Sequence, residues 1–368
     1  MSAAPPFTHL VRGLPATVPF VAPDAIERQT GRELRLRLGA NENLFGPSPR
    51  AIEAMRSALG RIAYYGDPES AALRDAIAET HGVTPDQIVV CSGIDDLLGL
   101  AVRAFVEPGT VAVTSLGAYP TFNFHVIGFG GQLQRVPYRD DANDLQALAD
   151  AAHRSSARLV YLANPDNPSG TWHAGSAVRD FIDRLPSDAL LLLDEAYIEF
   201  APPGTTPAID PSDPRVLRMR TFSKVYGLAG ARIGYGIGTK DTIAAFDKIR
   251  HHFGVNAVAQ AGALASLGDR EHVEMVVAAV AEGRRDLERL ARTLGVATLP
   301  SATNFVAIDV GGNARARAML SALQARGVFV RMPGAPPLDR CIRVTVAPPD
   351  DRAEFAQIFQ EIVSNFSG

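Results

Sequence analysis

The fold is decided by the segment Leu190-Leu191-Leu192-Leu193-Asp194-Glu195-Ala196-Tyr197, in which four leucines are followed at once by two acidic residues. A short, continuous apolar run predicts a strand that is buried on both faces, as in a parallel sheet covered by helices. In such sheets, ligands gather at the carboxyl ends of the strands. Asp194 is therefore expected at a binding site, although an aspartate after a strand can also cap the following turn.

Similar apolar runs recur on both sides of this segment. They predict strands at Ile88–Val90, Val111–Thr114, Leu159–Ala163, Val216–Met219 and Ile233–Ile237. Helical patterns lie between them, such as Ser70–His81, for which Ser70 is the expected N-cap and Gly82 the expected stop. The alternation predicts βα units that build a mostly parallel sheet.

The pattern changes after about residue 270. A charged amphipathic helix is predicted through Glu282–Leu294, followed by strands at Phe305–Val310, Val328–Arg331 and Ile342–Val346. Helices between and after them indicate a separate α+β module. The proline-rich first 25 residues are expected to lack regular structure and to run over the surface to this module. We expect a large domain at 45–265 and a small domain made of 1–44 and 266–368.

The composition limits the classes of function. The chain has 368 residues, a net charge of −4 and a pI of about 6.1, which disfavours nucleic acid and anionic lipid as partners. Neither a signal peptide nor a membrane-spanning run is recognisable, so a cytoplasmic protein is expected. The two cysteines have no metal-ligand spacing, and adjacent His251 and His252 would face apart on a helix, so we expect no metal.

Only three lysines occur, and one of them, Lys224, lies in the segment Thr221-Phe222-Ser223-Lys224-Val225-Tyr226-Gly227-Leu228-Ala229-Gly230-Ala231-Arg232. An amine, two hydroxyls and a guanidinium at this spacing suit pyridoxal 5′-phosphate (PLP), whose aldehyde reacts with an amine and whose phosphate needs charge-assisted hydrogen bonds. A surface lysine in an ordinary loop is the alternative. Lys240 and Lys248 are predicted to be solvated charges.

Three more motifs fit a PLP site. A carboxylate at Asp194 can keep a pyridine nitrogen protonated, and Tyr197 can donate to the phenolate oxygen of the cofactor. The turn Asn164–Gly170 presents Asn167 to the same oxygen. The glycine turn at Cys91–Asp96 leads into a helix whose N-terminus can bind phosphate. Each of the last two segments could also be a plain turn.

In their order and spacing these motifs resemble the fold-type I PLP-dependent aminotransferases, and within them the histidinol-phosphate aminotransferase family. The resemblance runs from Leu38–Pro49 to Ile342–Thr345. It implies an α/β fold with a large domain, built on a mostly parallel seven-stranded sheet, and a smaller α+β domain. It also implies that Lys224 forms the imine with PLP and moves the proton of the substrate.

The resemblance extends to the contacts of the cofactor. It implies that Asp194 binds the pyridine nitrogen, that Tyr197 and Asn167 bind the phenolate oxygen, and that Tyr119 stacks on the ring. It also implies a set of groups that hold the phosphate: Thr221, Ser223, Arg232, the backbone of Ile94 and Asp95, and Tyr65 from a second subunit. Such a contribution from Tyr65 implies a homodimer.

For the substrates, the resemblance implies an amino donor and a 2-oxo acid acceptor, expected to be 2-oxoglutarate. Arg343 and Arg331 match the pair that grips the phosphate or carboxylate of the donor. Asn43, within Asn41-Glu42-Asn43, and Asn256 match positions at the entrance. Three departures from the family pattern are Leu44, Asp166 and Gly117-Ala118, and we expect all of them near the substrate.

Other functions fit the sequence less well. An aminotransferase for aromatic amino acids or a lyase resembling threonine-phosphate decarboxylase would use the same cofactor site. A nicotinamide dehydrogenase is suggested only by Gly234, Gly236 and Gly238, which lie inside a predicted strand and lack the required spacing. A regulator would need a DNA-binding module, for which no room exists before residue 38. We therefore expect an aminotransferase of histidine biosynthesis that acts on histidinol phosphate.

Overall fold

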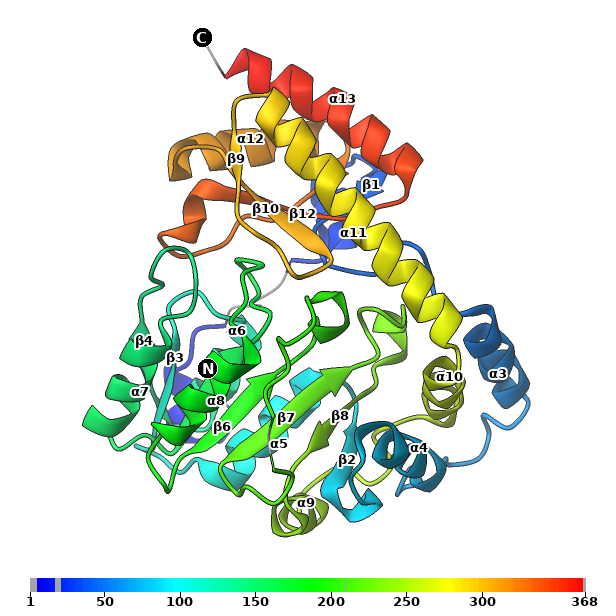
Figure 1. Ribbon diagram of the computed structural model, residues 1–368, viewed down its shortest axis with the longest axis vertical. Coiled ribbons are helices and arrows are strands. Elements are labelled where there is room, and N and C mark those ends of the chain that lie inside the picture. The colour runs from blue at the N-terminus through cyan, green and yellow to red at the C-terminus, as the bar shows by residue number, and fades with distance from the viewer. Residues whose placement is uncertain (1–4, 17–20, 209, 367–368) are drawn as a thin grey trace.

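The structure is a computed structural model that describes residues 5–16, 21–208 and 210–366. A large sheet with its helices forms the lower part of the molecule in Figure 1, and a smaller group of helices and short strands forms the upper part. The chain passes from the lower to the upper part through one long helix, α11 (Arg270–Thr293).

The large sheet has seven strands. Their order is β2 (Ile88–Cys91), β8 (Gly234–Ile237), β7 (Val216–Thr221), β6 (Leu190–Asp194), β5 (Leu159–Ala163), β3 (Val111–Ser115) and β4 (Gln132–Val136). β8 runs antiparallel to both of its neighbours, with Cys91 opposite Gly234, and the other pairs are parallel. The prediction of a mostly parallel seven-stranded sheet is confirmed.

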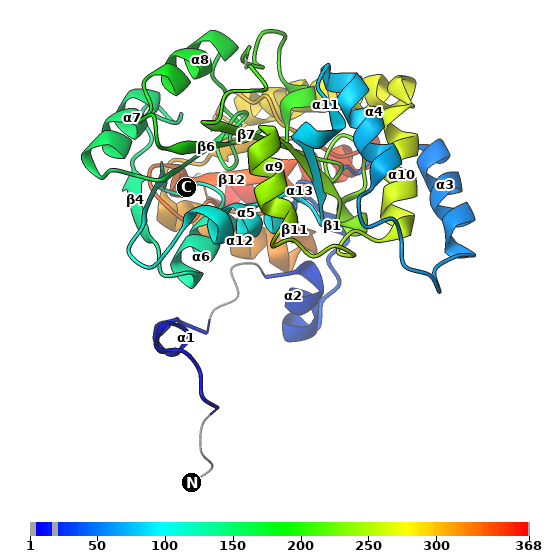
Figure 2. The same ribbon diagram turned by 90° about the horizontal axis from the view of Figure 1, so that it is seen from below.

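The leucine run of β6 is continuous because helices cover both faces of the sheet (Figure 2). Leu192 belongs to a core cluster with Phe122, whereas Leu193 packs in a different cluster with Phe181. Successive side chains of a strand point to opposite faces, and burying each leucine contributes about 1.5–3 kcal/mol. One face carries α5 (Ile94–Phe105), α6 (Pro120–Gly128) and α9 (Lys240–Asp247), and the other carries α7 (Leu145–Arg154) and α8 (Gly175–Asp183).

One edge of the molecule, beside β2, carries α3 (Pro49–Leu59), α4 (Ala71–His81) and α10 (Ala257–Leu267). The expected stop of α4 at Gly82 is confirmed, since Gly82 has a left-handed φ of 65° and its backbone N–H donates to the carbonyl of Ala78. Ser70 occupies the N-cap position as expected, but its hydroxyl makes no capping hydrogen bond. Asp67 caps the helix instead, accepting from the backbone N–H of Ala71 at 2.7 Å.

The upper part contains a three-stranded antiparallel sheet, β12 (Cys341–Thr345), β10 (Phe305–Asp309) and β9 (Ala297–Thr298), with α12 (Asn313–Ala325) and α13 (Pro349–Asn365). The early strand β1 (Leu36–Arg37) pairs in parallel with β11 (Val328–Phe329). Because β1 packs there, we propose the division into 45–265 and 1–44 plus 266–368, with the join at the end of α10.

Helices begin earlier and extend further than the sequence predicts. The helix expected at Glu282–Leu294 starts at Arg270. The first 25 residues were expected to lack regular structure, yet α1 (His9–Gly13) forms within them and α2 (Pro23–Thr30) begins there. Pro23 starts α2 without loss, since the first helical residue needs no N–H partner. Figure 2 shows α1 standing away from the rest of the chain.

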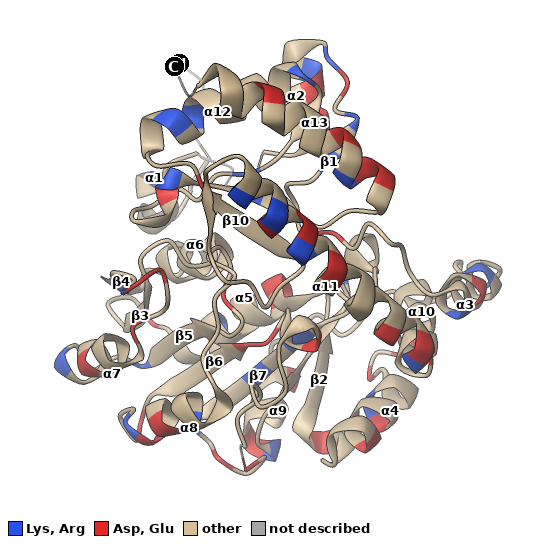
Figure 3. Cartoon of the chain, turned by 45° about the horizontal axis from the view of Figure 1, so that its top comes forward, with Lys and Arg blue, Asp and Glu red and all other residues tan. Residues whose placement is uncertain are grey.

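The surface carries interleaved charges, as the alternating blue and red segments of α11 show in Figure 3. None of the helices in the described ranges is long and apolar enough to cross a membrane. Cys91 and Cys341 are both buried and unpaired.

Candidate active site

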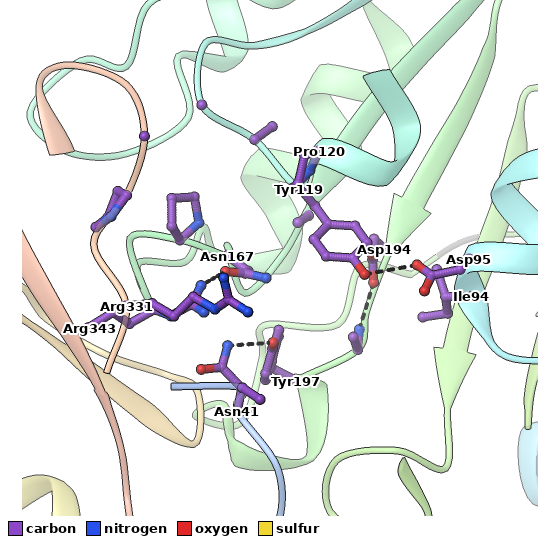
Figure 4. Close-up of a pocket in the computed structure, with 18 of the residues that line it drawn as sticks. Asn41, Ile94, Asp95, Tyr119, Pro120, Asn167, Asp194, Tyr197, Arg331 and Arg343 are labelled. Carbon is purple, nitrogen blue, oxygen red and sulfur yellow. Dashed lines mark hydrogen bonds between the residues drawn. The ribbon is translucent and has the colours of Figure 1, made fainter. Parts of the chain in front are cut away.

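A cavity of about 860 Å³ lies at the carboxyl ends of β5, β6 and β7, with strands of the upper part on its other side. Its volume is within the range of small-molecule sites. Twelve of the predicted site residues line it: Ile94, Asp95, Tyr119, Asn167, Asp194, Tyr197, Thr221, Ser223, Lys224, Arg232, Arg331 and Arg343. Figure 4 shows Arg331 and Arg343 entering from the side opposite to Ile94 and Asp95.

One end of the cavity is built to hold an anion. No side chain caps the N-terminus of α5, so its first N–H groups are free to bind a ligand. Gly93 precedes this helix with a φ of 88°, and a Cβ there would come within 2.6 Å of the Arg232 guanidinium. Arg232 also lies 3.4 Å from the Ser223 hydroxyl and 3.7 Å from Asp95.

Lys224 follows β7 and points into the cavity. Its Nζ donates to the backbone carbonyl of Asn41 at 3.1 Å and lies 5.5 Å from the centre of the Tyr197 ring. It has no ion pair with a carboxylate of the described chain. The other two lysines lie elsewhere: Lys240 pairs with Asp86 at 2.7 Å, and Lys248 ends α9.

Asp194 ends β6 and is buried. It accepts hydrogen bonds from the Tyr161 hydroxyl at 2.7 Å and from the backbone N–H of Ala196 at 3.0 Å. Burial raises the pKa of the Asp194 carboxyl to about 6, although these hydrogen bonds oppose the shift. Asp194 thus lines the cavity and also caps the turn, so both sequence interpretations hold.

Tyr197 is held by a residue in an unusual conformation. Its hydroxyl accepts from the side-chain amide of Asn41 at 2.9 Å. Asn41 has a φ of 56°, in the left-handed region that few residues other than glycine adopt, and this geometry lets its carbonyl reach Lys224 as well. The backbone of Asn41 is tied in turn to the Thr345 hydroxyl at 3.1 Å.

The opposite end of the cavity carries a cation, Arg343, whose side chain is partly buried. Arg343 donates to the side-chain oxygen of Asn167 and, at 3.1 Å, to the carbonyl of Gly39. No carboxylate of the described chain forms an ion pair with it, and its Nε has no partner in the described chain. Burial lowers the pKa of Arg343 to about 10. Arg331 lies beside it, and the two residues form an isolated backbone bridge.

Only one of the three departures from the family pattern lies on the cavity wall. Gly117 and Ala118 line it, as expected. Leu44 packs against the core of the upper part and does not line the cavity. Asp166 is buried behind the wall and accepts from Tyr138, Asn143 and Ser169. These hydrogen bonds hold the turn that presents Asn167. That Leu44 or Asp166 lies near the substrate stays a prediction.

Three predicted site residues do not line the cavity. Tyr65 is 84% exposed and packs against Phe253, with the ring centroids 4.7 Å apart and the rings tilted. Asn43 is buried and donates to the carbonyl of Val225 at 2.9 Å. Asn256 caps α10 by accepting from the backbone N–H of Ala259 at 2.7 Å. Their roles in ligand binding stay predictions.

The cavity wall also contains residues that sequence reasoning did not assign to the site. Among them are Tyr161, Asn123, Arg135 and the loop from Met332 to Ala335. Asn41 and Glu42, from the segment that the resemblance places at the entrance, also line the cavity. Tyr161 lies inside an apolar strand and Arg135 in a polar one, so nothing in their neighbourhood signals a ligand.

The residues of the wall fit PLP. An uncapped helix end, two hydroxyls and Arg232 converge where a phosphate could bind, with the carboxylate of Asp194 and the amine of Lys224 on the same wall. A phosphate, a pyridine nitrogen and an aldehyde need these three kinds of group. The donor set therefore matches the three functional groups of the cofactor.

Comparison with known proteins agrees with this chemistry. The sequence profile of the family "Aminotransferase class I and II" matches residues 35–359. A crystal structure of histidinol-phosphate aminotransferase from Sinorhizobium meliloti, in complex with pyridoxal-5′-phosphate, is 48% identical, with a TM-score of 0.96 and full coverage of both chains.

Two curated relatives carry the same description. Histidinol-phosphate aminotransferase 2 of Carboxydothermus hydrogenoformans is 35% identical over 92% of this chain and 94% of its own length. Histidinol-phosphate aminotransferase of Anaeromyxobacter sp. is 37% identical over 91% of this chain and 93% of its own.

The fold and the site define an enzyme of the PLP-dependent aminotransferase class, which takes an amino donor and a keto acid as substrates. Within that class, the chain belongs to the histidinol-phosphate aminotransferase family. The resemblance seen in the sequence is thereby confirmed.

Proposed function

We propose that this enzyme transfers the amino group of histidinol phosphate to 2-oxoglutarate, as a step of histidine biosynthesis. One observation carries the choice of donor: the partly buried guanidinium of Arg343 has no carboxylate partner in the described chain and faces the cavity. A buried charge without a partner is costly, and an anionic substrate would relieve that cost. The names of the relatives support a phosphate-bearing donor.

We assign the cofactor contacts to residues of the cavity wall. Asp194 is assigned to the pyridine nitrogen, Tyr197 and Asn167 to the phenolate oxygen, and Tyr119 to the face of the ring. The phosphate is assigned to Thr221, Ser223, Arg232 and the backbone N–H groups of Ile94 and Asp95. Free N–H groups at a helix N-terminus and an arginine are the donors that a phosphate dianion prefers, which supports this assignment.

When bound, PLP supplies an aldehyde that captures the amine and a ring that withdraws electrons from the neighbouring carbon. Lys224 would hold the cofactor, and its Nζ, once released, would move the proton of the carbon that bears the amino group of the donor. Asp194 would keep the pyridine nitrogen protonated. Asn41 orients both Lys224 and Tyr197, through the hydrogen bonds of 3.1 and 2.9 Å.

The test is a visible absorption spectrum of the holoenzyme before and after addition of histidinol phosphate without any keto acid. We expect the absorption of bound PLP to disappear and to return with 2-oxoglutarate. A spectrum that is unchanged by histidinol phosphate but bleached by phenylalanine would contradict the proposed donor. Release of carbon dioxide from threonine phosphate would identify a lyase instead.

We also propose a homodimer in which Tyr65 reaches the cofactor phosphate of the partner. Its exposure and its contact with Phe253, which is 55% exposed, support this proposal, since large exposed apolar groups mark interfaces. Mixing inactive Lys224→Ala and Tyr65→Ala chains tests it. Mixed dimers would hold one intact site, so about a quarter of the wild-type activity should return. No recovery after subunit exchange would place Tyr65 in its own subunit's site.

We propose that the enzyme works in the cytoplasm. Its two cysteines are buried and unpaired, and a reducing compartment keeps such thiols reduced. Fractionation of cells that produce the tagged protein would test this proposal.

A further inference from the structure

Cationic residues outnumber anionic residues on the part of the cavity wall that the cofactor does not contact. If PLP takes Arg232, Lys224, Asp95 and Asp194, the charged residues left on the described wall are Arg331, Arg343, Arg135 and Glu42. Three guanidinium groups then face one carboxylate. Complementary potentials favour ligands of opposite charge, so this side of the cavity suits a dianion.

Arg135 is the one arginine of this set to which neither the cofactor contacts nor the proposed donor contacts assign a role. It lies on the edge strand β4, opposite Thr114 of β3, and its side chain is exposed at the cavity wall. Its side chain forms no hydrogen bond or ion pair with any residue of the described ranges. By contrast, Arg139, a few residues further along the chain, pairs with Asp144 at 2.6 Å.

A second polar group lies close to this position. Asn123, on α6, lines the same cavity, and α6 packs against β4. The side-chain oxygen of Asn123 is buried and has no hydrogen-bond partner within the described chain. An apolar ring placed here would leave this acceptor unpaired, which costs free energy. The wall therefore favours a polar ligand over the side chain of an aromatic amino acid.

We propose that Arg135 is a specificity-determining residue that binds an anionic group of the substrate, a carboxylate or a phosphate, at the outer wall of the cavity. The inference rests on the proposed function, because it deepens the choice between anionic and aromatic substrates. Arg331 and Arg343 hold one anionic group in the interior. Arg135 then holds the outer oxygens of the same group or the second carboxylate of a dicarboxylic 2-oxo acid.

The experiment compares Arg135→Gln with a matched control, Arg154→Gln, an exposed arginine on α7 that lies outside the cavity. KM and kcat are measured separately for the donor and for the acceptor. Arg135→Gln should raise one or both KM values about tenfold, while kcat stays within about twofold, since a charge-assisted contact is lost without a change at the reacting atoms. Arg135→Lys should restore part of the affinity.

The two measurements identify the source of the anion. A higher KM for the donor alone assigns Arg135 to the phosphate, and a higher KM for the acceptor alone assigns it to the carboxylate. Unchanged KM values for both would overturn the proposal. So would an equal loss of kcat with an altered visible spectrum, because that pattern indicates a structural role.

Binding of inorganic phosphate and of succinate to the holoenzyme, followed by visible absorption, separates this proposal from the proposed function. If the wild type does not accept histidinol phosphate but Arg135→Gln weakens the binding of either anion about tenfold, the donor is wrong and the anion subsite stands. If Arg135→Gln binds both anions as tightly as the wild type does, the subsite is refuted, whichever donor the enzyme uses.

Discussion

The two ends of the cavity differ in how far the chain satisfies its own polar groups. At the proposed cofactor end, Asp194 accepts two hydrogen bonds from its own chain, and Arg232 lies beside Ser223 and Asp95. At the substrate end, Arg343 is partly buried without a carboxylate partner in the described chain, and its buried Nε has no hydrogen-bond partner there. The first end is largely preorganised, whereas the second leaves charge for a ligand to neutralise.

This difference predicts that the residues at the two ends control different kinetic constants. Groups at the cofactor end should control whether any reaction occurs, so their loss should reduce kcat for every substrate. Groups at the substrate end should control which molecule reacts, so their loss should change KM. The predictions that follow test this separation, from the largest expected effect to the smallest.

Replacing Lys224 with alanine should reduce kcat by at least about 10³-fold, because general acid–base catalysis alone contributes about 10²–10⁴-fold. PLP should still bind, through the phosphate contacts, but borohydride should attach no cofactor to the chain. Mass spectrometry of the reduced protein checks this. A covalent adduct in this variant would mean that another lysine holds the cofactor; Lys240→Ala, at a surface ion pair, is the control.

Replacing Asp194 with asparagine should lower kcat about 10²–10³-fold, since loss of one partner from a buried ion pair costs about 3–5 kcal/mol. Exposed Asp150→Asn should leave kcat unchanged. Equal activity of the two variants would remove Asp194 from the cofactor site.

Asp194 should also make the stability of the cofactor-free protein depend on pH. Because the pKa of Asp194 is about 6 in the folded chain, against an ordinary 3.8, the folded chain holds this proton more tightly than the unfolded chain does. The cofactor-free protein should therefore lose up to about 3 kcal/mol of stability from this group as the pH rises from 4 to 7. Urea unfolding should show this slope in the wild type and a weaker one in Asp194→Asn.

Replacing Arg343 with glutamine should raise the KM for the phosphate donor about 10- to 100-fold, because charge-assisted hydrogen bonds contribute about 1.5–3 kcal/mol. The ligand-free protein should become more stable, by about 1 kcal/mol, since a desolvated charge without a counter-ion is removed. Thermal unfolding and steady-state kinetics are measured on the same preparations. A loss of stability together with an unchanged KM would mean that Arg343 stabilises the fold and does not bind the substrate.

The smallest effect is expected at Asn256, which caps α10 outside the cavity. Asn256→Ala should lower stability by about 1 kcal/mol, the usual value of an N-cap, without a change in KM. Asn256→Ser, which can also cap the helix, should restore the stability. A higher KM in the alanine variant would support the role at the substrate entrance that the sequence predicts.

The buried strands were predictable because their environment is uniform. Leu159–Ala163 and Leu190–Asp194 match β5 and β6 at both ends, since helices cover both faces and every position is apolar until the first polar residue. β4 was missed because it is an edge strand whose only buried residue is Val136. An edge strand is recognised by its pairing partner, which the local sequence does not reveal.

The site residues that directly follow a recognisable strand were predictable from the sequence. Lys224 and Asp194 stand directly after apolar strands, and the sheet brings such positions together at one edge. The contacts of Asn41 were not predicted, because they depend on its backbone conformation and on Tyr197 and Thr345, which are distant in sequence. Arg135 carries no local signal at all, since an arginine on a polar edge strand usually faces solvent.

The antiparallel strand β8 has a consequence for the order of assembly. The anion-binding end of the cavity joins the turn after β2 to the arginine just before β8, and these segments meet only when Cys91 and Gly234 pair. Contacts between such distant segments form slowly, because a long loop must close first. During synthesis, a chain that has emerged only as far as β7 already carries Thr221 and the N-terminus of α5 but still lacks Lys224 and Arg232. Capture of the cofactor is therefore a late event, and it reports that the sheet has closed on its final strand.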